Sequence, residues 1–372
     1  MNKNKIIWLI AVIALVSVLV AYFKFQKIPV KKETVKVGII LPLTGDAGSY
    51  GKSLQEGVIT ADSLLSDSLG FDLQIIYEDS KAEPQQAVSA MNKLLSADKV
   101  SSVIGDMFTS TTLAIAPIAE KNNILLLSPT GSANEISKGK KQVFRIYPSE
   151  IEEGNTLSTF YNSKFSSQKA AIIYANEDAM KNVVSTIKIN LGSSSVAYES
   201  SFNKGTKDFK SIISSIPKDI SNVFIIGYMD DAALLIKQSK EMNKSFAFFG
   251  ISTLYDKKFI EITKNAANGV YLTAPFFSVK SENENVNKFV SKYKSIYNKD
   301  PDVWAGYGYD ALNIIVKVLS ESKSKKIEPF KAMEMLKDYD GVTGLTTINA
   351  DHSINKQFNI VQISNNDFQV IK

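Results

Sequence analysis

The sequence predicts an α/β protein of two lobes, each built on a parallel sheet with helices on both faces. Short apolar runs rich in valine and isoleucine alternate with segments of helical periodicity. This alternation forms two successive series, over residues 35–127 and 170–265, and each series predicts a sheet of its own. The chain has 372 residues, which is long enough for two lobes that each bury a core.

The first 33 residues predict a transmembrane signal anchor followed by a tether. Residues 6–23 carry no charge and follow two lysines, and at about 1.5 Å per residue a helix here spans about 27 Å of a ~30 Å hydrocarbon core. Bulky residues stand where a signal peptidase prefers small ones, so we expect no cleavage, with a cleaved signal peptide as the alternative. Lysine counts alone favour the opposite orientation, but the signal-like start favours an extracytoplasmic body.

The first series predicts four buried strands with helices between them. Leu54, Val58 and Ala61 share one helical face, and a second helix begins at Pro84. A third helix follows Thr109, and Pro117 within it predicts that it is short or kinked. The predicted strands are residues 35–41, 73–77, 100–104 and 124–127.

The second series repeats the pattern, and the end of the chain departs from it. Strands are predicted at 170–174, 195–198, 223–226 and 246–249, and helices at 178–191, 206–216, 231–242 and 256–265. Later helices are predicted at 284–297, 303–319 and 329–337, with a surface connector at 320–326. Short strands are predicted at 345–348, 358–363 and 368–371, with Asn365 and Asn366 forming the turn between the last two.

Composition excludes several classes of chemistry. The chain has no cysteine and one histidine, so we expect no disulfide, no metal site and no cofactor. That histidine, His352, has polar neighbours and is predicted to be a solvated loop residue. Six of the 43 basic residues lie in the first 32 positions, which leaves 37 basic against 38 acidic residues in the body. With Arg145 as the only arginine, binding to nucleic acid is not expected.

Several motifs in order resemble the Leu/Ile/Val-binding branch of type I periplasmic binding proteins, over about residues 35–350. The resemblance implies that fold, with two Rossmann-like lobes joined by three hinge crossovers near 146, 275 and 339. It divides the chain into 1–33, then 34–146 and 276–338 for lobe 1, and 147–275 and 339–372 for lobe 2. The motifs are VGIILPLTG (37–45), PQQAV (84–88), VIG (103–105), LSP (127–129), FR (144–145), GTKDF (205–209), GVY (269–271) and GYDA (308–311).

The resemblance and the physics of parallel sheets both place a ligand beyond the carboxyl ends of the strands. In the first lobe, Thr109 and Ser110 open a helix and can hold a carboxylate, although plain helix capping is the alternative. Gly131 and Ser132 follow the next strand and are predicted to contact the polar head of the ligand, and Tyr50 is predicted as a wall of the pocket.

The second lobe departs from the family at the two positions that decide the ligand. Residues 176–179 carry no tyrosine, and residues 251–253 carry no carboxylate to pair an ammonium group. Asp178, or Glu177 beside it, is the candidate replacement, and a ligand without an ammonium group, such as a small amide, is the alternative. Tyr174, Tyr228 and Ser252 complete the predicted ligand-binding residues.

We expect a solute-binding protein that captures an amino acid or small amide-like compound and works with the permease and ATPase of an ABC-type importer. A sensory receptor domain that signals through a partner is the alternative. An enzyme is not expected, because the chain lacks a G-x-G-x-x-G loop after its first strand, a P-loop and a nucleophile elbow. The adjacent carboxylates of Glu152 and Glu153 point in different directions at a helix start, which argues against acid–base catalysis.

Overall fold

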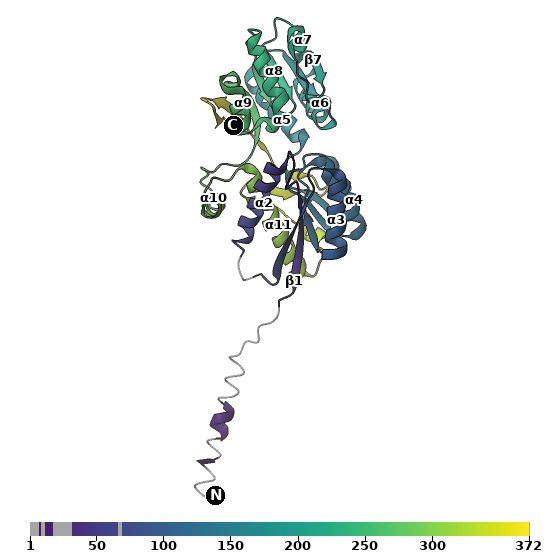
Figure 1. The fold of residues 1–372 in the computed structure, drawn as a ribbon, viewed down its shortest axis with the longest axis vertical. Coiled ribbons are helices and arrows are strands. Elements are labelled where there is room, and N and C mark those ends of the chain that lie inside the picture. Colours follow the sequence, from purple (N-terminus) through teal and green to yellow (C-terminus); the bar gives the residue numbers. More distant parts are fainter. Residues whose placement is uncertain (1–6, 9–11, 18–31, 66–68, 372) are drawn as a thin grey trace.

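The computed structural model describes residues 7–8, 12–17, 32–65 and 69–371. Two lobes lie one above the other in Figure 1. The lower one contains helices α2 (Gly48–Asp62), α3 (Pro84–Lys93), α4 (Thr109–Asn122), α10 (Glu284–Tyr297) and α11 (Val303–Lys325). The upper one contains α5 (Glu150–Phe165), α6 (Asp178–Leu191), α7 (Lys210–Ser215), α8 (Met229–Glu241) and α9 (Lys257–Thr263).

The first sheet is parallel throughout, with strand order β2-β1-β3-β4-β5. Successive side chains of a strand point to opposite faces, so Ile39 packs towards α2 and α11 while Ile40 packs towards α3 and α4. Both faces are therefore buried, as the continuous apolar runs predict. The strands are β1 (Thr34–Leu41), β2 (Asp72–Asp79), β3 (Ser102–Ile104), β4 (Leu125–Ser128) and β5 (Val143–Arg145).

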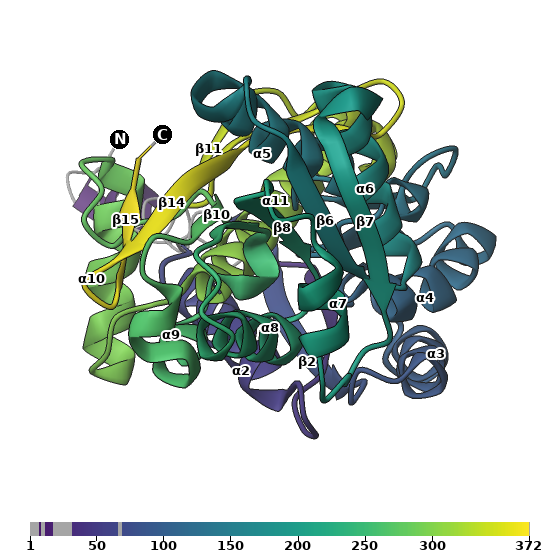
Figure 2. The same cartoon turned by 90° about the horizontal axis from the view of Figure 1, so that it is seen from above.

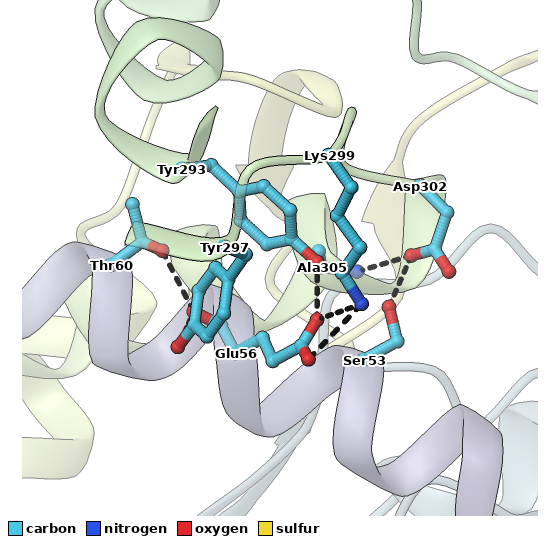
Figure 3. Close-up of polar contacts among 8 residues, drawn as sticks. All are labelled: Ser53, Glu56, Thr60, Tyr293, Tyr297, Lys299, Asp302 and Ala305. Atoms are coloured by element: carbon cyan, nitrogen blue, oxygen red, sulfur yellow. Dashed lines mark hydrogen bonds and ion pairs between the residues drawn. The ribbon is translucent and has the colours of Figure 1, made fainter. Parts of the chain in front are cut away.

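Polar contacts fix α2 against α10 and the segment that joins α10 to α11 (Figure 3). The carboxylate of Glu56 on α2 accepts a hydrogen bond from the hydroxyl of Tyr293 and pairs with Lys299 Nζ at 2.8 Å. One turn earlier, Ser53 donates its hydroxyl to Asp302, the residue that caps α11. Because Lys299 is more than half exposed, this ion pair orients the helices and adds little stability.

The second sheet has the order β15-β14-β10-β9-β8-β6-β7, and its last two strands along the chain pair antiparallel. Its core is aromatic, and Phe249 packs against Phe224 and Tyr271 with ring centroids 5.2 and 5.4 Å away. Figure 2 shows the long strands β6 and β7 beside α6. The strands are β6 (Ala170–Ala175), β7 (Val196–Phe202), β8 (Asn222–Ile226), β9 (Ala247–Gly250), β10 (Tyr271–Pro275), β14 (Phe358–Ser364) and β15 (Asp367–Val370).

A third, small sheet differs from the predicted assignment of residues 339–372 to lobe 2. It contains β11 (Tyr339–Gly341), β12 (Gly344–Ile348) and β13 (Ile354–Asn355), and Ile348 is buried in the core of the first lobe together with α12 (Pro329–Glu334). Only β14 and β15 join the second sheet. The side chain of Ile348 packs against the apolar side chains of α12. The alternating pattern of a short strand shows that one face is buried, but not which lobe buries it. The other predicted boundaries, near 33, 146 and 275, stay predictions.

Several elements differ from their sequence patterns. Helix α4 is 14 residues long and includes Pro117, although the sequence predicted that it is short or kinked. Helix α11 includes most of the residues predicted as a surface connector at 320–326. The pattern missed α5, because its buried face begins with the carboxylates of Glu150 and Glu153 instead of apolar side chains. Ser149 caps this helix by accepting the N–H of Glu152 at 3.1 Å. A serine followed three residues later by a glutamate is typical of a helix N-terminus, so the sequence does contain a signal for this helix. The asparagine turn is confirmed, with both residues at positive φ between β14 and β15.

The prediction that His352 is a solvated loop residue was wrong. His352 is 6 % exposed, stacks on Phe144 with ring centroids 4.2 Å apart, and places Nε2 3.2 Å from the carboxylate of Glu334. Its flat ring fills the first-lobe core in the way an aromatic residue does.

The predicted membrane segment, residues 6–23, falls largely outside the described residues. Within the part of the chain that the structure describes, no helix is both long and apolar enough to cross a bilayer.

Candidate functional site

The loop after β3 leads into an uncapped helix N-terminus in the first lobe. Helix α4 begins at Thr109, and the preceding residue gives it no side-chain cap, so its first N–H groups remain available. Thr109 is half-buried and Ser110 is exposed. Behind them, the buried carboxylate of Asp106 accepts the N–H of Met107, and burial raises the pKa of Asp106 to about 6.

The loop after β4 lies beside this helix start and is tied to it. Thr130 donates its hydroxyl to the carbonyl of Met107 at 2.8 Å, and the N–H of Gly131 bonds to Ser128 Oγ at 3.1 Å. A Cβ at position 131 would lie 2.7 Å from that oxygen and 2.4 Å from Ile136 Cδ1, so a larger residue here would force these two side chains to move. The structure therefore brings Thr109 and Ser132 to the same edge of the first sheet.

Aromatic side chains line the same region and reach the second lobe. Tyr50 meets Trp304 edge to face at 5.9 Å, and Tyr147 stacks on Trp304 at 6.3 Å. Burial and the carboxylate of Asp256, on the facing lobe, raise the pKa of the Tyr50 hydroxyl. The hydroxyls of Tyr147 and Ser252 lie 3.2 Å apart, so two contacts link the lobes through tyrosine.

The second lobe presents carboxylates at the carboxyl ends of its strands. Tyr228 follows β8 and donates its hydroxyl to Glu177 at 2.6 Å, while Lys204 Nζ lies 4.2 Å above the Tyr228 ring. Glu153 is buried and accepts the backbone N–H of Ser252 at 2.7 Å. Burial raises the pKa of Glu153, although its hydrogen bonds act in the opposite direction.

One carboxylate bridges the lobes and had no signal in the sequence pattern. Glu150 is 5 % exposed and accepts hydrogen bonds from Ser132 of the first lobe and from Asn182 on α6, both at 3.1 Å. It lies beside Arg145, whose guanidinium donates to the carbonyl of Tyr147 at 2.5 Å and is 1 % exposed. Burial lowers the pKa of Arg145 to about 10.

Two predicted site residues lie elsewhere. The side chain of Asp178 is fully exposed and pairs with Lys181 at 3.4 Å on the surface of α6, and no contact joins it to the other site residues among those described. Tyr174 lines a separate groove of about 630 Å³ between α6 and β7. Glu177 precedes the helix, is half-buried and accepts the hydroxyl of Tyr228, whereas Asp178 is the first residue of the helix. Among the described residues, no group of three or more acidic or histidine side chains is placed to hold a metal ion.

The sequence profile of the periplasmic binding protein family matches residues 34–367. A leucine-, isoleucine-, valine-, threonine- and alanine-binding protein from Pseudomonas aeruginosa is 25 % identical over 321 residues, covering 84 % of each chain. A Leu/Ile/Val-binding protein from Escherichia coli K12 is 24 % identical over 250 residues, covering 65 % of this chain and 68 % of that protein.

Solved structures show the same fold. A leucine-binding protein from Thermotoga maritima superposes with a TM-score of 0.81 at 22 % identity, covering 91 % of this chain and 98 % of that one. A branched-chain amino acid transporter substrate-binding protein from Streptococcus pneumoniae, in complex with isoleucine, gives 0.78 at 23 %, with coverage of 91 % and 99 %. These relatives are binding proteins, so the resemblance and the prediction of a protein without catalytic activity are confirmed.

Proposed function

Because this chain belongs to the periplasmic binding protein family, we propose that it captures an amino acid between its lobes and delivers it to an ABC-type importer. The observation that carries the proposal is the opposition of two kinds of group across the lobes. An uncapped helix N-terminus lies on the first lobe, and the carboxylate of Glu177 lies on the second. The first attracts an anion and the second a cation, which suits the two ends of an amino acid.

Individual roles follow from this arrangement. Thr109 and Ser110, with the N–H groups of α4, would receive the ligand carboxylate. Gly131 and Ser132 would contact its polar head, and Tyr50 would form a wall. Glu177, held by the hydroxyl of Tyr228 at 2.6 Å, replaces Asp178 as the candidate partner of the ammonium group.

Ser252 keeps its place in the proposed site, next to the buried carboxylate of Glu153. The names of the relatives support a ligand with a small aliphatic side chain, such as leucine, isoleucine or valine.

A thermal-shift screen of the full chain in detergent tests this proposal. The panel contains leucine, isoleucine, valine, threonine and alanine, with 4-methylpentanoate and leucinamide as analogues that lack the ammonium or the carboxylate. A ligand at a hundred times its Kd stabilises the folded state by about 2.7 kcal/mol, which shifts the midpoint visibly. We expect a shift with at least one amino acid and with neither analogue. A shift with an analogue alone would replace the amino acid by an organic acid or an amide, and no shift at all would contradict the proposal.

The double variant Thr109→Ala, Ser132→Ala is expected to weaken binding of the responding amino acid at least tenfold, because it removes a hydroxyl from each of the two ligand loops. Isothermal titration measures the affinity, and the melting midpoint without ligand confirms the fold. Ser166→Ala, at the far end of α5, is the matched control. Unchanged affinity in the double variant would remove both hydroxyls from the site.

We also propose that residues 6–23 hold the protein at the outer face of the membrane. Alkaline carbonate extraction is expected to leave the full-length chain in the membrane pellet. Release of a shorter chain into the soluble fraction would instead indicate a cleaved signal peptide.

A further inference from the structure

The carboxylate of Glu150 controls which atom Ser132 can present to the cleft. Ser132 Oγ donates to Glu150 Oε1 at 3.1 Å, and Asn182 Nδ2 donates to Oε2 at the same distance. An ionised carboxylate carries no hydrogen, so each partner must be the donor. Ser132 thereby uses its only hydroxyl hydrogen inside the protein, and its remaining lone pairs can only accept.

We propose that Glu150 is a positioning residue that fixes Ser132 as a hydrogen-bond acceptor, so that the cleft selects ligands with an N–H donor at this point. The inference rests on the proposed function, which places Ser132 beside the ligand. It adds a reason for selectivity: a carboxylate or carbonyl oxygen at Ser132 would meet lone pairs, whereas an ammonium or amide N–H would be bound.

The surroundings of Glu150 make its charge state responsive to pH. Burial raises the pKa of Glu150, while the hydrogen bonds from Asn182 and Ser132 lower it. The charged groups that face it are Arg145 on β5, which favours the ionised form, and Glu135 in the turn after β4, which opposes it. Glu150 in turn acts electrostatically on Glu153 and on Tyr228. Below the raised pKa, a protonated Glu150 can donate to Ser132, and the selection for an N–H donor is lost.

Glutamine at position 150 tests this directly. In Glu150→Gln the side chain can turn either its oxygen or its NH₂ group towards Ser132, so the serine is no longer fixed as an acceptor. The second variant, Glu150→Gln with Asn182→Asp, restores the arrangement, because an aspartate at 182 accepts the glutamine NH₂ and leaves the glutamine oxygen for Ser132. Glu152→Gln removes the same charge from the same helical turn, at a carboxylate that bonds to Asn155 and Thr156, and is the control.

The measurement is the affinity of the full chain for L-leucine and for 4-methylpentanoate by isothermal titration between pH 4.5 and 8. We expect Glu150→Gln to weaken leucine binding at least tenfold and to abolish the loss of leucine affinity at low pH. The variant should not lose affinity for 4-methylpentanoate, which the unaltered chain is not expected to bind. The double variant should recover most of the affinity, and Glu150→Gln should have little further effect when Ser132 is already alanine.

The possible results distinguish a failure of the positioning role of Glu150 from a failure of the proposed amino-acid function. If the unaltered chain binds leucine and Glu150→Gln binds it equally with the same pH profile, the positioning role is wrong while the function stands. The positioning role is also wrong if the effects of Glu150→Gln and Ser132→Ala simply add. If the unaltered chain binds neither probe, the amino-acid function fails, and the selection that depends on it fails too.

Discussion

Replacing Asp310 by alanine is expected to lower the free energy of unfolding by about 3–5 kcal/mol, the usual cost of breaking a buried charged network by removing one partner. Asp310 is fully buried on α11 and accepts the N–H groups of Val342 and Thr343, both at 2.9 Å. Buried Lys356 bonds to the hydroxyl of Thr343 at 2.7 Å and has Asp310 as its stabilising negative charge. The variant would leave unpaired N–H groups and an uncompensated cation inside the protein.

The pH dependence of this effect has a definite sign. Burial lowers the pKa of Lys356 to about 8, so between that value and the ordinary lysine pKa the unfolded chain binds more protons than the folded one. Stability from this group therefore rises with pH in that window, and without Asp310 the gain should be larger. Urea unfolding of both proteins at pH 7 and pH 9 measures this gain in the free energy of unfolding.

Lys356→Met in the Asp310→Ala background should recover part of the loss, because it removes the unpaired cation. Asp72→Ala, at an exposed aspartate, should change stability by less than about 0.5 kcal/mol. Equal losses at positions 310 and 72 would contradict the network.

Gly308→Ala is expected to destabilise the first lobe by about 1–3 kcal/mol, despite the better helix propensity of alanine. Helices α2 and α11 cross at two glycines. A Cβ on Gly308 would lie 2.0 Å from the carbonyl oxygen of Leu54, and one on Gly57 would lie 1.9 Å from that of Ala305. Both obstacles are backbone atoms, so no side-chain rotation relieves the clash, and the helices must separate. Urea unfolding monitored by circular dichroism measures the loss.

Gly70→Ala is the matched control, because a Cβ there meets no atom within 4 Å. It should be neutral or slightly stabilising. A Gly308→Ala variant as stable as this control would show that the two helices can move apart freely.

Much of the fold could be predicted because its strands are buried on both faces. Runs such as residues 37–41 are then apolar throughout, and the helices between them show one apolar stripe. The elements that were missed have polar residues at buried positions. Helix α5 buries Glu150 and Glu153 against partners far along the chain, and no local pattern contains those partners.

The site was predictable at its backbone and less so in its side chains. Loops after β3 and β4 follow from strand order alone, which is why Thr109 and Ser132 lie at one edge. The partial burial of Glu177 and the full exposure of Asp178 depend on where α6 begins, within a single residue. The bridging role of Glu150 depends on contacts to Ser132 and Asn182 in two different lobes, which the sequence pattern does not specify.

Because Arg145 is buried, cleavage after this residue can be used to detect opening of the first lobe. It is the only arginine in the chain and is 1 % exposed, at the end of strand β5. A protease that cuts only after arginine therefore finds no substrate bond until β5 leaves its sheet. A single cut between Arg145 and Ile146 would then report opening of that lobe alone, and its rate, with and without ligand, would separate the stability of the first lobe from that of the second.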